Sequence, residues 1–227
     1  MTRLSDPPTS PAPAEPLRRA VFIDKDGTLV ENVPYNVDPA LLRFTPHAIP
    51  ALRRLADAGF LLVVVSNQPG VAQQRFGLPA LQELANALDG RLRRAGVPLA
   101  GFYVCPHAPA GEPFGGRCRC RKPAPGLLLE AAREHGIDLT RSWMVGDILD
   151  DVEAGWRAGC GSVLMDVGNE TEWRWSPIRI PDFRVADLAG AAASILAAPV
   201  VARARTLGRH PTIRRPGSTA ARNRAAA

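Results

Sequence analysis

Short apolar runs alternate with longer amphipathic stretches along most of the chain. The apolar runs are typical of buried parallel strands, and they cover residues 20–23, 60–65, 101–104, 143–145 and 162–165. The amphipathic stretches predict helices near residues 46–58, 78–95, 125–135, 150–158 and 187–197. This alternation predicts an α/β fold with a Rossmann-like, doubly wound parallel sheet. Because ligands bind beyond the carboxyl ends of such strands, the residues after each run are the first site candidates.

Glycine and proline residues support several of the predicted helix ends. A glycine follows four of the helices, where a left-handed C-terminal residue is common: Gly59, Gly96, Gly136 and Gly159. A proline lies near the start of three of them: Pro46, Pro79 and Pro125. Pro50 would fall inside the first helix, which indicates that this helix begins later than residue 46.

The positive charge of the chain is concentrated near its C-terminus. The 227 residues carry a formal charge of +6, but residues 199–227 hold seven Arg and no acid, which leaves −1 for the remainder. We therefore expect a disordered Pro-rich leader (residues 1–17), one domain (residues 18–197) and a disordered basic tail (residues 198–227). The small net charge of the domain argues against a nucleic-acid partner.

The sequence shows no sign of export or of membrane insertion. It has no signal-peptide pattern and no run of about 18 apolar residues, which a bilayer-spanning helix needs. We therefore expect a cytoplasmic protein with no membrane partner, and we expect it to be a monomer.

Two carboxylates and a glycine turn directly follow the first apolar run, in the segment Asp24-Lys25-Asp26-Gly27-Thr28. Asp24 could attack phosphorus and carry an aspartyl-phosphate, while Asp26 could protonate the leaving oxygen and then activate water. Mg²⁺ suits such a sparse acidic site, because it combines a few carboxylates with phosphate oxygens and water. The alternative is a turn whose aspartates only cap local structure.

Polar residues also follow later runs. Ser66 and Asn67 come after the second run and could donate hydrogen bonds to phosphate, although ordinary turn chemistry explains this segment when it is taken alone. Arg121 and Lys122 precede the helix predicted at residue 125. A lysine there could neutralise phosphate charge and position the attacking carboxylate, and the alternative is a solvated basic pair.

A further set of carboxylates follows the fourth run. Asp147 is an additional candidate Mg²⁺ ligand, and it comes from a different strand than Asp24. Asp151, four residues on, could orient a metal-bound water or support another ligand. Either Asp150 or Asp151 could instead cap the following helix.

The segment 105–120 contains four potential soft ligands: Cys105, His107, Cys118 and Cys120. Three thiolates and one imidazole form a closed tetrahedral set, which is typical of structural Zn²⁺. Residues 108–117 have no core-forming pattern, so a metal would explain how this loop is held. The alternatives are reduced cysteines without a metal, or a Cys118–Cys120 redox pair. Because the protein fills all four positions, such a zinc should not activate water.

Taken in order, four strand-end segments resemble the haloacid dehalogenase (HAD) superfamily of phosphohydrolases over residues 18–197: Asp24-x-Asp26-Gly27-Thr28, Ser66, Lys122 and Gly146-Asp147-x-x-x-Asp151. The cysteine loop, which runs into Arg121-Lys122-Pro123, resembles the zinc-loop branch of that superfamily. This branch contains D-glycero-D-manno-heptose 1,7-bisphosphate 7-phosphatase and the phosphatase domain of histidinol-phosphate phosphatase. The resemblance implies an essentially capless HAD-like domain whose zinc loop helps to enclose a small phosphorylated metabolite.

The resemblance also implies roles by position. Asp24 would be the nucleophile and Asp26 the acid/base, with Mg²⁺ held by Asp24, the Asp26 backbone carbonyl and Asp147. Ser66 and Lys122 would steady the phosphoryl group. The implied substrate contacts are Asn32, Tyr35, Asn67 and Arg121.

The implied activity is Mg²⁺-dependent phosphomonoester hydrolysis, with heptose bisphosphate as the leading substrate. Histidinol phosphate, or another small sugar or polyol phosphate, is the alternative. A non-enzymatic alternative is an inactive module that uses the zinc loop for interactions.

Overall fold

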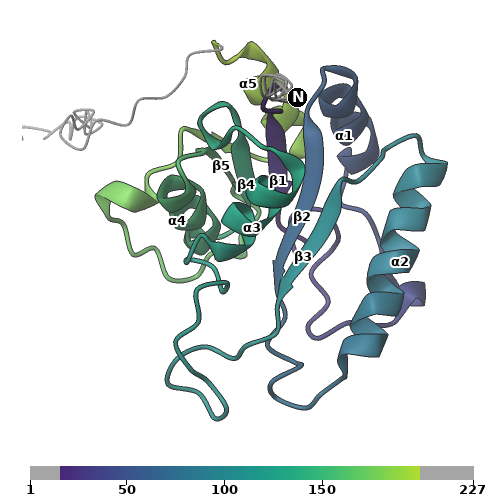
Figure 1. Cartoon of the computed structure of the whole chain (residues 1–227), viewed down its shortest axis with the longest axis vertical. Coiled ribbons are helices and arrows are strands. Elements are labelled where there is room, and N and C mark those ends of the chain that lie inside the picture. Colours follow the sequence, from purple (N-terminus) through teal and green to yellow (C-terminus); the bar gives the residue numbers. More distant parts are fainter. Residues whose placement is uncertain (1–15, 200–227) are drawn as a thin grey trace, which may run out of the picture.

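The computed structural model describes residues 16–199. Within them, six parallel strands form one sheet in the order β3-β2-β1-β4-β5-β6 (Figure 1). The strands are β1 (Ala20–Ile23), β2 (Leu61–Asn67), β3 (Gly101–Cys105), β4 (Trp143–Gly146), β5 (Gly161–Met165) and β6 (Phe183–Val185). The predicted α/β fold with a doubly wound parallel sheet is confirmed. The predicted leader and tail lie almost entirely outside the described residues, so the domain boundaries stay a prediction.

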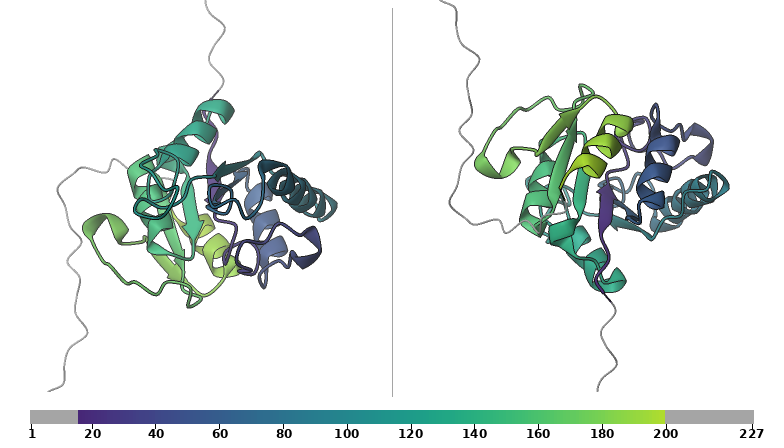
Figure 2. Two further views of the ribbon diagram at one scale, coloured as in Figure 1. Left: turned by 90° about the horizontal axis from the view of Figure 1, so that it is seen from below. Right: turned by 90° about the horizontal axis from the view of Figure 1, so that it is seen from above.

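Helices cover both faces of this sheet. They are α1 (Ala48–Asp57), α2 (Leu78–Arg94), α3 (Gly126–His135), α4 (Leu149–Ala158) and α5 (Leu188–Ala197), with short 3₁₀ turns at η1 (Pro39–Leu41), η2 (Leu139–Arg141) and η3 (Pro177–Arg179). Figures 1 and 2 show α1 and α2 on one side of the sheet and α3 and α4 on the other. Among residues 16–199, no helix combines the length and apolar character needed to cross a bilayer. The expected cytoplasmic location stays a prediction.

Alternate residues of the central strand feed two separate hydrophobic cores. Val21 and Ile23 of β1 belong to the core under α1, α2 and α5, while Ala20 and Phe22 belong to the core under α3 and α4. All four side chains are fully buried. A strand buried on both faces reads as a continuous apolar run, which is why β1 was readily predicted from the sequence.

Three element predictions differ from the structure. The strand β6 was missed, because it has only three residues and lies at the sheet edge with the exposed Arg184 at its centre. The helix predicted from residue 46 begins at Ala48, which places Pro50 in its first turn. There the absence of an N–H costs little, because first-turn N–H groups have no partner within the helix. The strand predicted over residues 60–65 continues through Ser66 and Asn67.

The strand order places a crevice at the carboxyl ends of β1 and β4. The chain runs outward from β1 to β2 and β3, and then crosses back to add β4 on the other side of β1. Ligands bind at such a reversal, because the two connections leave in opposite directions and open the sheet edge between them. Asp24 follows β1 here and Asp147 follows β4. The start of β1 and the end of α5 lie together on the opposite side, at the amino ends of the strands (Figure 1).

Candidate active site

Three carboxylates from three elements meet at this crevice. Asp24 follows β1, Asp147 follows β4, and Asp151 lies in the first turn of α4. One carboxylate oxygen from each lies within 4.8 Å of the others, and all three residues are buried. Asp24 and Asp147 were expected to converge. Asp151, which was considered as a helix cap or a supporting residue, lies in the same cluster.

Lys122 binds two of these carboxylates. Its Nζ lies 2.5 Å from Asp24 Oδ1 and 2.6 Å from Asp151 Oδ1, and it also donates to the Val65 carbonyl at 3.1 Å. The residue is 2% exposed. Burial alone would lower the pKa of Lys122, but the charges of Asp151 and Asp24 outweigh it and raise this pKa above its ordinary value. Lys122 is therefore a buried, charged lysine bound to the candidate nucleophile.

Asn67 holds the backbone of Lys122 on both sides. Its Nδ2 donates to the Lys122 carbonyl at 3.1 Å, and its Oδ1 accepts from the Lys122 N–H at 3.0 Å. This arrangement ties the end of β2 to the segment that precedes α3. Its side-chain amide is thus used to place Lys122. The predicted contact between Asn67 and substrate stays a prediction.

The acidic cluster holds more negative charge than its cations balance. Burial, together with the charge of Asp24, raises the pKa of Asp147 to about 6. Burial raises the pKa of Asp151 to about 8 against the opposing effect of Lys122. Three buried carboxylates and one lysine leave an excess of negative charge, which a divalent cation would neutralise. The donor set therefore fits a hard cation such as Mg²⁺.

Side chains around Asp147 fix its orientation. Thr28 donates to its Oδ1 at 3.1 Å, and Asn169 Nδ2 donates to its Oδ2 at 2.7 Å. Gly27 lies against the same carboxylate, since a Cβ built on Gly27 would be 2.2 Å from Asp147 Oδ2. The glycine of the Asp-x-Asp-Gly-Thr segment is thus required by close approach as well as by its φ of +84°.

Asp26 lies beside the cluster and has its own partners. Gln68 Nε2 donates to Asp26 Oδ2 at 2.9 Å, and the Lys25 ammonium pairs with Oδ1. Burial is the largest influence on Asp26 and raises its pKa, with the charge of Lys25 opposing and that of Asp24 adding to the rise. A carboxyl group with a raised pKa is suited to hold a proton for transfer.

The remaining predicted substrate contacts lie on loops around the crevice. Tyr35 is 41% exposed and stacks under the guanidinium of Arg75, with 3.9 Å from Arg75 Cζ to the ring centroid. Asn32 lines a cleft of about 520 Å³ that also includes Gly27 and Asn169. This cleft adjoins Asp147, because Asn169 contacts both. The predicted substrate contacts of Asn32 and Tyr35 stay predictions.

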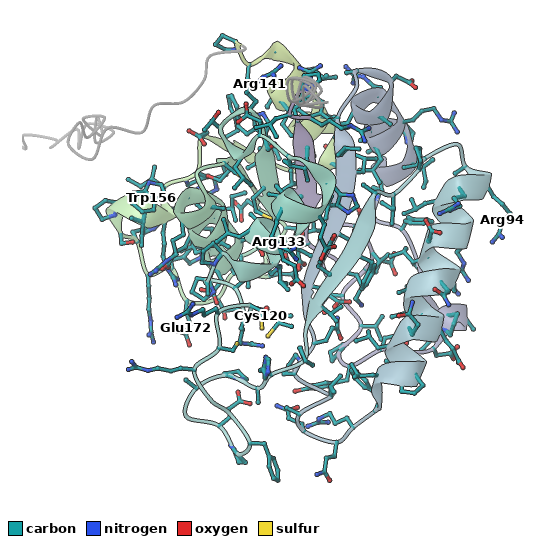
Figure 3. The ribbon with its side chains drawn as sticks, in the orientation of Figure 1. Arg94, Cys120, Arg133, Arg141, Trp156 and Glu172 are labelled. Carbon is teal, nitrogen blue, oxygen red and sulfur yellow. The ribbon has the colours of Figure 1, made fainter. Side chains whose placement is uncertain are left out.

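The four soft ligands gather at the end of β3. Figure 3 shows the sulfur atoms of this cluster beside the labelled Cys120. Cys105 Sγ lies 3.7 Å from Cys118 Sγ and 3.3 Å from Cys120 Sγ, and His107 Nδ1 lies 3.4 and 3.2 Å from the sulfurs of Cys105 and Cys120. Sulfurs bound tetrahedrally to Zn²⁺ at about 2.3 Å are separated by about 3.8 Å, whereas disulfide sulfurs are about 2.05 Å apart. The cluster therefore has the spacing of a metal site, and its cysteines are free thiols.

Arg121 connects this cluster to the acidic site. Its backbone N–H donates to Cys118 Sγ at 3.3 Å, and its Nη1 donates to the His107 carbonyl at 3.2 Å. Burial opposes ionisation of Cys118, but the Arg121 N–H and the neighbouring thiols lower the pKa of Cys118. Arg121 therefore holds the loop that leads directly into Lys122, and its predicted contact with substrate stays untested.

Asp150 and Asp151 have different positions from the predicted helix cap. The N-cap residue of α4 is Ile148, and its N–H donates to Asp151 Oδ2 at 3.3 Å. Asp150 instead pairs with Arg179 of η3 at 2.8 Å. Neither aspartate therefore occupies the N-cap position, but Asp151, at the third helical position, caps the start of α4 by accepting the Ile148 N–H.

Sequence reasoning missed three residues that shape the site. Gln68 holds Asp26, Asn169 holds Asp147, and Glu170 accepts the Leu149 N–H of α4 at 2.8 Å. Gln68 directly follows the predicted Ser66-Asn67 pair, so its place after a buried strand was a usable signal. Asn169 and Glu170 lie in the long connection after β5, where no pattern marks them.

Comparison with known proteins identifies relatives of this chain. A HAD-hydrolase-like family model matches residues 119–191. The chain is 39% identical over 148 residues to the D-glycero-beta-D-manno-heptose-1,7-bisphosphate 7-phosphatase of Yersinia pestis. The matched region covers 64% of this chain and 79% of that protein. The chain is 40% identical over 148 residues to the Escherichia coli K12 enzyme of the same name, which covers 64% of this chain and 78% of that one.

A solved structure shows the same architecture. D,D-heptose 1,7-bisphosphate phosphatase from B. bronchiseptica, complexed with magnesium and phosphate, has a TM-score of 0.64 and 27% identity, and the match covers 78% of this chain and 98% of that one. The predicted resemblance is confirmed, and the alternative of a non-enzymatic module is set aside by relatives that are named phosphatases. The chain belongs to the HAD family of phosphatases, in the group that includes the heptose bisphosphate phosphatases.

Proposed function

We propose that this chain is a Mg²⁺-dependent phosphomonoester hydrolase that acts on D-glycero-β-D-manno-heptose 1,7-bisphosphate through an aspartyl-phosphate on Asp24. The names and identities of its relatives support this substrate. The observation that carries the mechanism is the buried contact between Lys122 Nζ and Asp24 Oδ1, beside the carboxylate of Asp147.

Mg²⁺ would be held by Asp24 and Asp147, together with the backbone carbonyl of Asp26. This proposal is supported by the clustered oxygens and by the excess negative charge around them. When bound, Mg²⁺ supplies positive charge that offsets the charge of the phosphoryl oxygens and of the attacking carboxylate. Asp151 also pairs with Lys122 Nζ in this scheme and keeps the ammonium in place.

In the first step, a carboxylate oxygen of Asp24 attacks phosphorus and the bond from phosphorus to the sugar oxygen breaks. Because Lys122 binds Oδ1, we assign the attack to Oδ2. Asp26 gives its proton to the leaving oxygen, so the sugar leaves as an alcohol. Ser66 and Lys122 donate to the phosphoryl oxygens as their charge develops.

In the second step, water hydrolyses the aspartyl-phosphate. Asp26, now ionised, accepts a proton from the water as the oxygen bonds to phosphorus. The bond between phosphorus and Asp24 then breaks and regenerates the carboxylate. Inorganic phosphate is released, and the proton on Asp26 restores the starting state.

We further propose that Cys105, His107, Cys118 and Cys120 hold a structural Zn²⁺. The spacing of their ligand atoms and the Arg121 N–H on Cys118 support this assignment. Arg121, together with Asn32 and Tyr35, would contact the part of the substrate that is not hydrolysed. A bisphosphate provides a second anion for the Arg121 guanidinium.

The test is steady-state kinetics of the purified protein on heptose 1,7-bisphosphate and on histidinol phosphate, with Mg²⁺ and with EDTA. We expect Mg²⁺-dependent release of phosphate and a higher kcat/KM for the heptose bisphosphate. Asp24→Asn should reduce kcat by more than about a thousandfold while circular dichroism stays unchanged. Equal, poor activity on both substrates would reject the substrate assignment, and full activity of Asp24→Asn would reject the nucleophile.

A further inference from the structure

Gln68 makes hydrogen bonds to two residues of the proposed mechanism at once. Its Nε2 lies 2.9 Å from Asp26 Oδ2 and 2.9 Å from Ser66 Oγ, and it donates to both. A primary amide nitrogen carries two hydrogens, so both are used. The residue is 4% exposed, and its backbone N–H donates to the Cys105 carbonyl at 2.7 Å.

We propose that Gln68 is a positioning residue, which fixes the acid/base carboxyl of Asp26 relative to the phosphate-binding hydroxyl of Ser66. The inference rests on the proposed function, because it deepens the roles assigned there to Asp26 and Ser66. In this scheme Gln68 contacts neither the substrate nor a proposed metal-ligand atom, and it acts through the two side chains that it holds.

The bond to Ser66 determines which way its hydroxyl points. Ser66 Oγ accepts the Gln68 N–H, so its own O–H remains to be donated elsewhere. Ser66 is 1% exposed and lies near the end of β2, on the edge of the sheet that holds Asp24. A phosphoryl oxygen bound at Asp24 is the acceptor that this hydroxyl would meet.

The bond to Asp26 connects two strands. Lys25, which pairs with Asp26 Oδ1, is its neighbour in sequence and belongs to the same loop. Gln68 follows β2 and therefore ties the Asp26 loop to a second strand. Loss of the Gln68 amide should therefore misplace the acid and leave the nucleophile intact.

The test compares two leaving groups. An alkyl phosphate needs a proton from Asp26 because an alkoxide is a poor leaving group, whereas p-nitrophenyl phosphate departs without one. Gln68→Glu keeps the side-chain length but has no N–H donors. Gln68→Met removes the donors without adding charge, which controls for misfolding caused by a buried carboxylate. Gln82→Glu on the exposed face of α2, where Gln82 donates to Asn86 at 2.9 Å, is the matched control.

We expect both Gln68 variants to lower kcat/KM on the sugar phosphate by about a hundredfold or more, and on p-nitrophenyl phosphate by less than about tenfold. We compare kcat/KM because it covers the steps up to departure of the leaving group and excludes the later hydrolysis step, which Asp26 serves on both substrates. Gln82→Glu should match the wild type. In an Asp26→Asn background, Gln68→Met should cause little further loss on the sugar phosphate, because the acid is already absent.

Equal losses on the two substrates, or additive losses in the Asp26→Asn background, would overturn the positioning role while leaving the proposed function in place. Full activity of Gln68→Met would overturn it as well. A wild-type protein that hydrolyses neither substrate would overturn the proposed function, and the inference would fall with it.

Discussion

Gly27 brings the backbone closer to the acidic cluster than any side-chain-bearing residue could come. Its φ of +84° lies in the left-handed region, and a Cβ there would meet both Asp147 Oδ2 at 2.2 Å and Asn169 Nδ2 at 2.4 Å. Replacing Gly27 by a residue with a Cβ would therefore have two effects. The left-handed backbone would cost about 1 to 2 kcal/mol, and the Cβ would displace Asp147, a proposed metal ligand. The two effects can be separated, because Gly59 has nearly the same φ, +85°, with nothing within 4 Å.

We therefore expect Gly27→Ala to raise the Mg²⁺ concentration needed for half-maximal activity by at least about tenfold. Gly59→Ala should lower the free energy of unfolding by a similar backbone cost, yet leave the Mg²⁺ dependence unchanged. Urea unfolding and Mg²⁺ titrations of activity measure the two quantities. If both variants shift the Mg²⁺ dependence equally, the close approach to Asp147 has no role in metal binding.

The residues of the site differ in how far they could be predicted. Asp24 and Asp147 each follow an apolar run, so a parallel sheet alone brings them to one edge. The contact between Lys122 and Asp24 joins residues 98 positions apart in the chain. That contact depends on the path of the loop before α3, which no local pattern specifies. Asn169 is even less predictable, since it lies in an irregular connection.

At the scale of elements, α3 shows how an amphipathic helix divides neighbouring residues between core and solvent. Leu128 is fully buried and belongs to the core under α3 and α4, whereas the next residue, Leu129, is 46% exposed. Leu128→Ala should lower the free energy of unfolding by about 2 to 5 kcal/mol. Leu129→Ala should change it by about 0.5 kcal/mol or less. Urea denaturation of both variants measures this, and equal costs would contradict the orientation of the helix.

The loop that carries the four proposed zinc ligands has little core of its own. Residues 108–117 between its ligand pairs were predicted to lack a core-forming pattern, and most of their side chains are exposed. Cys118→Ser should abolish stoichiometric zinc, about one ion per chain in the wild type, because three ligands bind far more weakly than four. It should also lower kcat, since Lys122 lies two residues beyond Cys120.

Zinc content by atomic emission after dialysis, together with kcat, measures both effects. Cys160→Ser is the matched control, because Cys160 is buried outside the cluster and its loss should leave the zinc content unchanged. Full retention of zinc by Cys118→Ser would contradict the proposed ligand set.

Sequence patterns predicted the elements best where burial is complete. β1 and β5 are buried at every position, and each was found close to its true bounds. β6 is only partly buried: the exposed Arg184 lies between the half-buried Phe183 and Val185, so its apolar content is too small to separate it from a loop. The boundary of β2 was misplaced because Ser66 and Asn67 are polar residues that still pair with β3.

At the scale of the whole molecule, the charge is distributed unevenly along the chain. The residues before 199 sum to −1, although the full sequence sums to +6. The site residues all lie within residues 16–199, so deletion of residues 200–227 should leave kcat/KM unchanged within about twofold. Binding to duplex DNA, measured at low and high salt, should be weak in the truncated protein. Strong salt-dependent DNA binding by the truncated protein would contradict the predicted absence of a nucleic-acid partner.

The fold class followed from the sequence, whereas the spatial order of the strands did not. Strand–helix alternation is sufficient for a parallel sheet with helices on both faces, because such crossovers have one favoured hand. The sequence order of the strands does not give their spatial order, and the position of the crevice between β1 and β4 depends on it.

The start of β1 and the end of α5 lie at the amino ends of the strands, on the side of the sheet away from the carboxylates (Figure 1). An affinity handle, fluorophore or solid support attached at residue 16 or at residue 199 would therefore be placed on the rear of the enzyme. The catalytic side would remain open to dissolved sugar phosphates, which makes the fold well suited to immobilised reactors and to fusion with other enzymes.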